Sequence, residues 1–99
     1  MNCPSYELFF EIFSNKTRMR IIESLTLSPK SVNEICKAIG EEQSKVSHNL
    51  KKLAECNFLE VQKQGKKRIY SLNKDTITPI LQLVKKHVEK YCSEACHRK

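Results

Sequence analysis

The chain has 99 residues, 39% of them hydrophobic, and its 18 Lys and Arg outnumber its 11 Asp and Glu to give a formal net charge of +7. This length makes one domain with no room for a second, and such a domain buries roughly 60–65% of its unfolded surface, so dimerisation would help to stabilise it. No run of about 18 apolar residues is present, which excludes a membrane-spanning helix, and no basic region followed by an apolar stretch opens the chain, so no secretory signal is expected.

The first half of the chain predicts three short helices. Residues 6–13, YELFFEIF, are apolar on most sides and predict a first, largely buried helix. Residues 19–25 carry apolar side chains three to four positions apart, which predicts a second helix. A third helix is expected within residues 31–40, because Ser31 and Glu34 have the spacing of a capping box and a glycine closes the segment.

A fourth helix, predicted at about 43–56, differs from an ordinary solvated helix. It begins QSKVSHNLKKL, with Val46, Leu50 and Leu53 on one side and polar or basic residues on the others, and it has no acid until Glu55. Only a tight turn separates it from the third helix, which is the geometry of a helix-turn-helix. Its Gln, Ser, His and Asn side chains match base edges and its lysines match phosphates, so we expect a recognition helix for double-stranded DNA.

A basic hairpin is predicted at about 59–72. Residues 59–63 and 68–72 alternate apolar and polar side chains, and Gln64–Gly65–Lys66–Lys67 joins them. Residues 45–68 hold seven Lys and Arg against two Glu, so +5 of the net +7 lies there. This concentration indicates a polyanionic partner, and a basic hairpin directly after a recognition helix is a wing.

A long last helix is predicted at about 79–96, with Pro79 at its first position. Its apolar stripe consists of Ile80, Leu81, Val84, Val88, Tyr91 and Ala95. The whole chain, residues 1–99, is therefore expected to form one mainly α domain with a small β-hairpin, a winged helix-turn-helix with five helices.

Five cysteines, at positions 3, 36, 56, 92 and 96, are an odd number in a chain with only two glycines. A secreted disulfide scaffold typically has an even number in a loop-rich chain, so a reducing cytoplasm is the expected location. If the last helix continues, Cys92 and Cys96 are four residues apart on one face, with Cβ atoms about 6 Å apart. That separation suits two thiolates on one soft ion.

Three segments in register resemble the ArsR/SmtB family of winged-helix repressors. FSNKTRMRIIESL (13–25) resembles the family's LSDPTRLRILELL, QSKVSHNLKKL (43–53) resembles its QSxVSxHLxxL, and KRIYSLN (67–73) resembles its xxVYYxL strand. The resemblance covers nearly the whole chain. It implies a homodimer, joined through the first and last helices, that binds operator DNA until an inducer weakens the binding. Two-fold symmetry would place the recognition helices about 34 Å apart on an inverted repeat.

The same resemblance implies roles for individual side chains. The residues expected to face bases are Gln43, Ser44, Ser47 and His48. Those expected near phosphates or in the flanking minor groove are Lys45, Lys51, Lys66, Lys67 and Arg68.

The metal sites best known in this family are missing. The family's third-helix CxC pair is replaced by Ser31 and Asn33, and of its last-helix ligands only His87 remains. What is left is the pair Cys92 and Cys96, with Cys3 or His97 as helpers. Thiolates without carboxylates favour soft ions such as Zn, Cd, As or Cu, which would act as the inducer. DNA binding itself is expected to need no cofactor.

Other functions stay open at this point. Cys36 resembles a cysteine of the family's redox and persulfide sensors, which pair it with a cysteine in the last helix. Here that partner would be Cys92, although Cys92 lies about one helical turn later than in those sensors. Cys36 also lies on a helix face whose other residues are typical of a core. A DNA binder without an inducer is a further alternative. A protein-interaction or RNA-binding winged helix is the alternative from another class, but RNA modules expose aromatic rings, and alternation places Tyr70 toward the core. No enzyme is expected, because no phosphate loop, paired catalytic carboxylates or nucleophile–base pair is visible.

Overall fold

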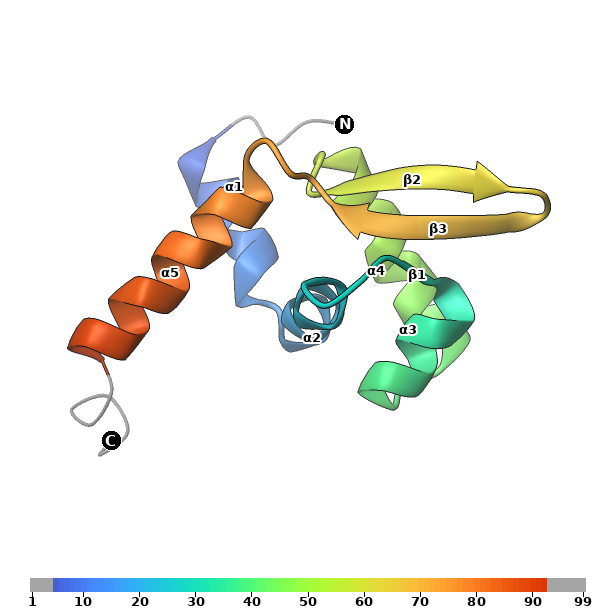
Figure 1. Ribbon diagram of the computed structural model, residues 1–99, viewed down its shortest axis with the longest axis horizontal. Helices are drawn as coiled ribbons and strands as arrows, with labels where there is room; N and C mark the ends of the chain where they lie inside the picture. Colours follow the sequence, from blue (N-terminus) through green and yellow to red (C-terminus); the bar gives the residue numbers. More distant parts are fainter. Residues whose placement is uncertain (1–4, 93–99) are drawn as a thin grey trace.

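The computed structural model describes residues 5–92, and within this range it contains five helices and three strands (Figure 1). The elements are α1 (Tyr6–Ser14), α2 (Lys16–Leu25), β1 (Lys30–Ser31), α3 (Val32–Ile39), α4 (Gln43–Glu55), β2 (Leu59–Gln64), β3 (Lys67–Leu72) and α5 (Ile77–Tyr91). The predicted winged helix-turn-helix is thereby confirmed. Among these described helices, none has both the length and the apolar character needed to cross a membrane.

Local hydrogen bonds determine where the helices of the helix-turn-helix begin and end. Ser31 Oγ accepts from the Glu34 N–H at 3.3 Å, and Glu34 Oε1 accepts from the Ser31 N–H at 2.8 Å, which completes the predicted capping box. The hydrogen bond from the Ser31 backbone N–H, followed by that of the Ser31 hydroxyl, holds the pKa of the Glu34 carboxyl below its usual value. Gly40 ends α3 in the left-handed region, with φ of 70°.

One hydrophobic core holds the helices and the base of the hairpin together. Its fully buried side chains come from α2, α3, α4 and the segments that follow them: Ile21, Ile22, Ile35, Val46, Leu50, Leu53, Phe58 and Ile77. Phe58 stacks against two rings of α1, with centroid distances of 5.0 Å to both Phe9 and Phe13. This aromatic cluster fixes α1 to the end of the recognition helix.

The three strands form one antiparallel sheet in the order β1-β3-β2. The two-residue strand β1 was not predicted, because it is defined only by its pairing with Ile69 and Tyr70 of β3. The hairpin spans residues 59–72 as predicted, but each strand is one residue longer than predicted, since Gln64 pairs with Lys67 and the turn is only Gly65–Lys66. Gly65 has φ of 63°, as the first central position of a type II′ turn requires.

The prediction of a largely buried α1 is wrong, because Ile12 is its buried residue while Tyr6 and Phe10 are 89% and 65% exposed. The last helix begins two residues before Pro79, and Tyr91 is its last helical residue within the described range, with Cys92 as its C-cap. The predicted residues 93–96 of this helix lie outside the described part of the chain. Pro79 is tolerated in the first turn because its missing N–H would have no partner within the helix.

Replacing Phe58 by Ala should lower the free energy of unfolding by about 3–5 kcal/mol, because a large ring is removed from a closed core. Thermal or urea denaturation measures this loss. The control is Val61→Ala on β2, where the side chain is 45% exposed and the change should stay within about 0.5 kcal/mol. Equal losses in the two variants would contradict the central role of the aromatic cluster.

Candidate nucleic-acid interface

The buried stripe of α4 determines which side of the helix faces the core. Val46, Leu50 and Leu53 are fully buried, as the sequence predicts. This packing leaves the opposite side of the helix in solvent, and all of its predicted DNA contacts are exposed: Gln43, Ser44, Lys45, Ser47, His48 and Lys51. The exposed side therefore combines hydrogen-bonding groups with cations, as base and phosphate contacts require.

A buried amide also lies in this stripe. Asn49 is only 7% exposed, and its Oδ1 accepts from Arg18 Nε of α2 at 3.0 Å. Its Nδ2 donates to the Lys45 carbonyl at 2.9 Å. The sequence-based expectation that this asparagine matches a base edge is wrong for Asn49, because positions 46, 49, 50 and 53 have the spacing of a helix face turned to the core.

The turn before α4 carries an exposed ion-pair cluster. Glu41 lies 3.6 Å from the Arg20 guanidinium and 3.4 Å from Lys45 Nζ. Ser44 Oγ donates to Glu42 Oε1 at 2.9 Å. Two of the predicted DNA-contacting side chains, Lys45 and Ser44, thus have carboxylate partners in the DNA-free protein, and a phosphate would compete with Glu41 for Lys45.

The wing projects away from the helices as a narrow two-stranded arm (Figure 1). The predicted contacts Lys66, Lys67 and Arg68 are all exposed, and among residues 5–92 none of them has an ion-pair partner. Arg68 lies directly opposite Lys63 in the register. Like charges facing each other across strands destabilise a hairpin, so a bound polyanion would relieve this repulsion.

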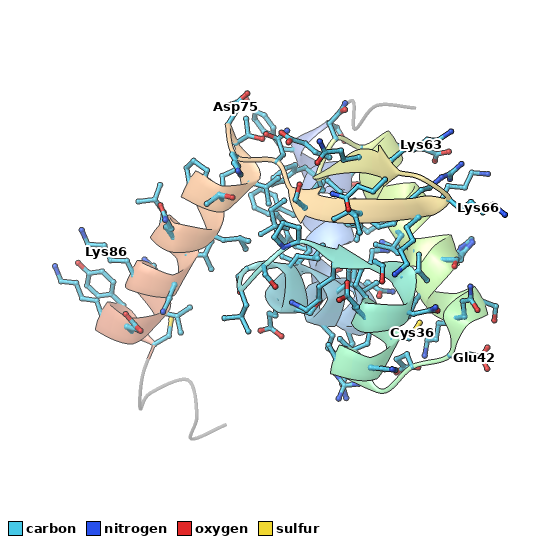
Figure 2. All side chains as sticks on the ribbon, turned by 45° about the vertical axis from the view of Figure 1, so that its right-hand side comes forward. Cys36, Glu42, Lys63, Lys66, Asp75 and Lys86 are labelled. Atoms are coloured by element: carbon cyan, nitrogen blue, oxygen red, sulfur yellow. The ribbon has the colours of Figure 1, made fainter. Side chains whose placement is uncertain are left out.

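The wing and the start of α4 share one side of the molecule. Figure 2 places the wing residues Lys63 and Lys66 and the α4 N-cap Glu42 toward one side, with Lys86 of α5 at the opposite side. The predicted buried position of Tyr70 is confirmed, since this side chain is 8% exposed. The surface formed by α4 and the wing is thus polar and cationic.

Most of the predicted sensing residues fall outside the described part of the chain. Cys3, Cys96 and His97 lie there, and Cys92 is half-buried at the end of α5. Within residues 5–92, no three His, Cys, Asp or Glu side chains group closely enough to hold a metal ion. Because α5 ends before Cys92, the structure does not supply the helical spacing on which the pairing of Cys92 with Cys96 was based.

The other two described cysteines belong to the core region. Cys36 and Cys56 are half-buried and pack against the hydrophobic core. Figure 2 labels Cys36 on the side of the molecule away from α5. The described structure therefore does not bring Cys36 next to the end of α5, where the alternative redox pair would need it.

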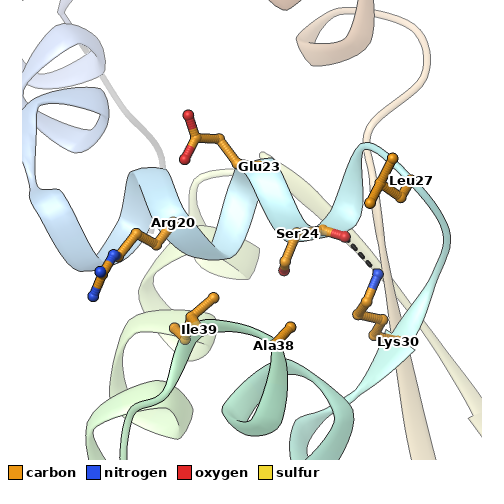
Figure 3. Close-up of a pocket in the computed structure, with 7 residues that line it drawn as sticks. All are labelled: Arg20, Glu23, Ser24, Leu27, Lys30, Ala38 and Ile39. Carbon is orange, nitrogen blue, oxygen red and sulfur yellow. Dashed lines mark hydrogen bonds between the residues drawn. The ribbon is translucent and has the colours of Figure 1, made fainter.

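The described residues line hollows on the surface. One, of ≈ 390 Å³, lies between α2 and α3 (Figure 3). Its cations are already engaged, because Lys30 Nζ donates to the Ser24 carbonyl and Arg20 pairs with Glu41. Another, of ≈ 990 Å³, is a largely apolar groove between α2 and α5.

The comparisons with known proteins agree with this geometry. Residues 15–61, the helix-turn-helix and its flanks, match the family of bacterial regulatory proteins described as the arsR family. No curated protein matches the chain in sequence.

Among solved structures, Rv0081 of Mycobacterium tuberculosis is 28% identical, with a TM-score of 0.82, and the alignment covers 94% of this chain and 97% of that one. The antimony-specific transcriptional repressor AntR is 25% identical, with a TM-score of 0.72 and coverage of 85% and 77%.

The same fold occurs in Mb0332 of Mycobacterium bovis, a homodimeric winged helix-turn-helix DNA-binding domain and possible ArsR-family regulator. It is 20% identical, with a TM-score of 0.78 and coverage of 84% of this chain and 77% of that one. The sequence match over residues 15–61 and the shared winged helix-turn-helix fold thus make the chain similar to the bacterial regulatory proteins of the arsR family.

Proposed function

We propose that this protein is a cytoplasmic, homodimeric repressor that binds an inverted-repeat operator and is released by a soft metal or metalloid. The observation that carries the DNA-binding part is the exposed face of α4, with its polar and basic side chains. Beside it lies a wing whose Lys66, Lys67 and Arg68 form no ion pair among the described residues. In this arrangement α4 enters the major groove and the wing contacts the flanking backbone.

The experiment that tests sequence-specific binding is selection from a random library of double-stranded DNA. Enrichment of an inverted repeat whose half-sites lie about one helical turn apart supports the proposal. Enrichment of no sequence, or preferential binding of RNA or of a protein partner, would contradict it.

The wing should contribute salt-dependent and sequence-independent affinity. The double substitution Lys66→Gln/Lys67→Gln should reduce the slope of log K against log salt by about 0.9 for each phosphate that the protein no longer neutralises, with an unchanged order of preferred sequences. Fluorescence anisotropy over a range of salt concentrations measures both quantities.

The matched control for the wing is Lys86→Gln, since Lys86 is an exposed lysine of α5 on the opposite side of the molecule (Figure 2). This change should leave the slope unaltered. A slope that falls equally in the control and in the wing variant would assign the salt dependence to overall charge.

Homodimerisation is supported by the apolar surface that α1 and α5 leave exposed. Tyr6 and Phe10 of α1, and Leu83 and Tyr91 of α5, are each more than 60% exposed. One of the solved relatives in fold, Mb0332, is itself a homodimer. A second copy covering these faces would remove apolar area from water, the main source of stability in such interfaces.

Leu83→Glu should convert the dimer into a monomer and weaken operator binding, because the two half-sites would then be bound independently. Sedimentation velocity gives the mass, and anisotropy gives the affinity. The control Gln82→Glu adds the same charge at the neighbouring position, which lines the groove between α2 and α5 of the same chain, and should leave the dimer intact. Dimers in both variants would place the interface elsewhere.

The inducer would bind the C-terminal thiolates Cys92 and Cys96, with Cys3 or His97 as a further ligand. Support comes from the soft character of this donor set and from the likeness to AntR, which is specific for antimony. Cys92 directly follows α5, so an ion held there could alter the helix that we assign to the dimer interface.

Cd(II), Zn(II) or As(III) should release the reduced protein from its operator, and Cys92→Ser/Cys96→Ser should abolish the release while retaining DNA binding. Cys56→Ser is the control, because Cys56 is a half-buried packing residue at the end of α4. Release only by a persulfide donor, lost in Cys36→Ser, would replace the metal with thiol chemistry. Release by neither class of compound would indicate a regulator without such an inducer.

A further inference from the structure

We infer that Asn49 is a positioning residue for DNA recognition: held by Arg18, it fixes the rotation of α4 on α2 and thereby sets sequence discrimination. The inference rests on the proposed DNA-binding function and adds a residue that does not itself face the DNA. Its amide lies on the buried side of α4, opposite the side chains assigned to bases.

Both ends of the Asn49 amide are used. Oδ1 takes the Arg18 Nε–H at 3.0 Å, and Nδ2 donates to the Lys45 carbonyl at 2.9 Å. Because the cation can only donate and the carbonyl can only accept, one orientation of the amide satisfies both partners. At 7% exposure, losing either bond would leave a polar group largely out of water, which is costly.

The Arg18–Asn49 bond gives the packing of α4 a direction, which the apolar contacts of α4 do not give. Val46, Leu50 and Leu53 hold the helix against the core, but hydrophobic contact has no preferred direction. A hydrogen bond has one. The Arg18–Asn49 bond links two helices at the turn of α4 that carries Ser47 and His48 on its outer side, so it resists rotation where base contacts are expected. Such contacts need placement to within about 0.5 Å.

The second polar link between α2 and the start of α4 differs in kind. Glu41, whose side chain is 22% exposed, bridges Arg20 and Lys45 at 3.6 and 3.4 Å, and the Arg20 and Lys45 side chains are about half exposed, at 48% and 50%. Ion pairs with such exposed cations constrain geometry weakly. Glu41 therefore offers a matched comparison, because removing its charge should change overall DNA affinity without changing the orientation of α4.

The test measures the ratio of affinities for the selected operator and for a scrambled duplex. Asn49→Leu keeps the charge and the branched side-chain skeleton but removes both hydrogen bonds, and should lower this ratio about tenfold, the scale of one charge-assisted bond. Asn49→Asp retains an acceptor for Arg18 and should keep the ratio, while its added negative charge weakens binding to both duplexes.

Two controls accompany these variants. Asn33→Leu makes the same substitution at an exposed position of α3 and should leave the ratio unchanged. Glu41→Gln should strengthen binding to both duplexes equally. Circular dichroism and thermal melting establish that each variant is folded.

A folded Asn49→Leu with the wild-type ratio would overturn the inference. If Asn49→Leu does not fold, the affinity ratios of Arg18→Lys and Asn49→Asp are compared instead. The inference requires that Arg18→Lys lowers the ratio while Asn49→Asp keeps it. A lower ratio in Asn49→Asp with a wild-type ratio in Arg18→Lys would overturn it. A wild-type protein that prefers no duplex refutes the proposed function itself, which distinguishes that failure from a failure of the Asn49 assignment.

Discussion

The burial of one side of α4 is the constraint on which the rest of the structure depends. Val46, Leu50 and Leu53 have no exposed surface, so this side of the helix faces the core and the side chains assigned to DNA face outward. The left-handed Gly40 allows α3 to stop just before α4 begins, and the same core encloses Phe58, from which the hairpin starts. The DNA-facing surface is therefore a consequence of how the opposite surface is packed.

Polar contacts fix the rotation of α4, which the apolar packing leaves free. The Arg18–Asn49 bond gives α4 a direction on α2, while the exposed Glu41 cluster balances charge without fixing geometry. In the wing, like charges are left unbalanced, because Lys63 and Arg68 face each other across the strands. This repulsion lowers stability at a surface that suits a polyanion. Such a cost is typical of a binding site and not of a structural element.

The far end of the molecule is built differently. Among the described residues, α5 buries Ile77 at its start and leaves most of its apolar side chains exposed. Asn73 connects this helix to the DNA-facing half: its N–H donates to the Phe58 carbonyl at 3.0 Å, and its Nδ2 donates to the Asn57 carbonyl at 2.9 Å. Its own carbonyl accepts from the Ile77 N–H at 3.0 Å. A rigid joint of this kind would connect the exposed helix α5 with the end of the recognition helix.

The helix-turn-helix, the wing and the exposed face of α4 could be predicted from the amino-acid sequence, because capping residues, apolar spacing and glycine positions act over three to seven residues. Features that depend on contacts between distant segments could not. Tertiary structure paired β1 with β3, buried Asn49 against Arg18, and left α1 exposed although its composition is that of a core helix. Apolar composition predicts that a surface will be buried. Only the packed chain shows which apolar surfaces its own core covers and which remain for another molecule.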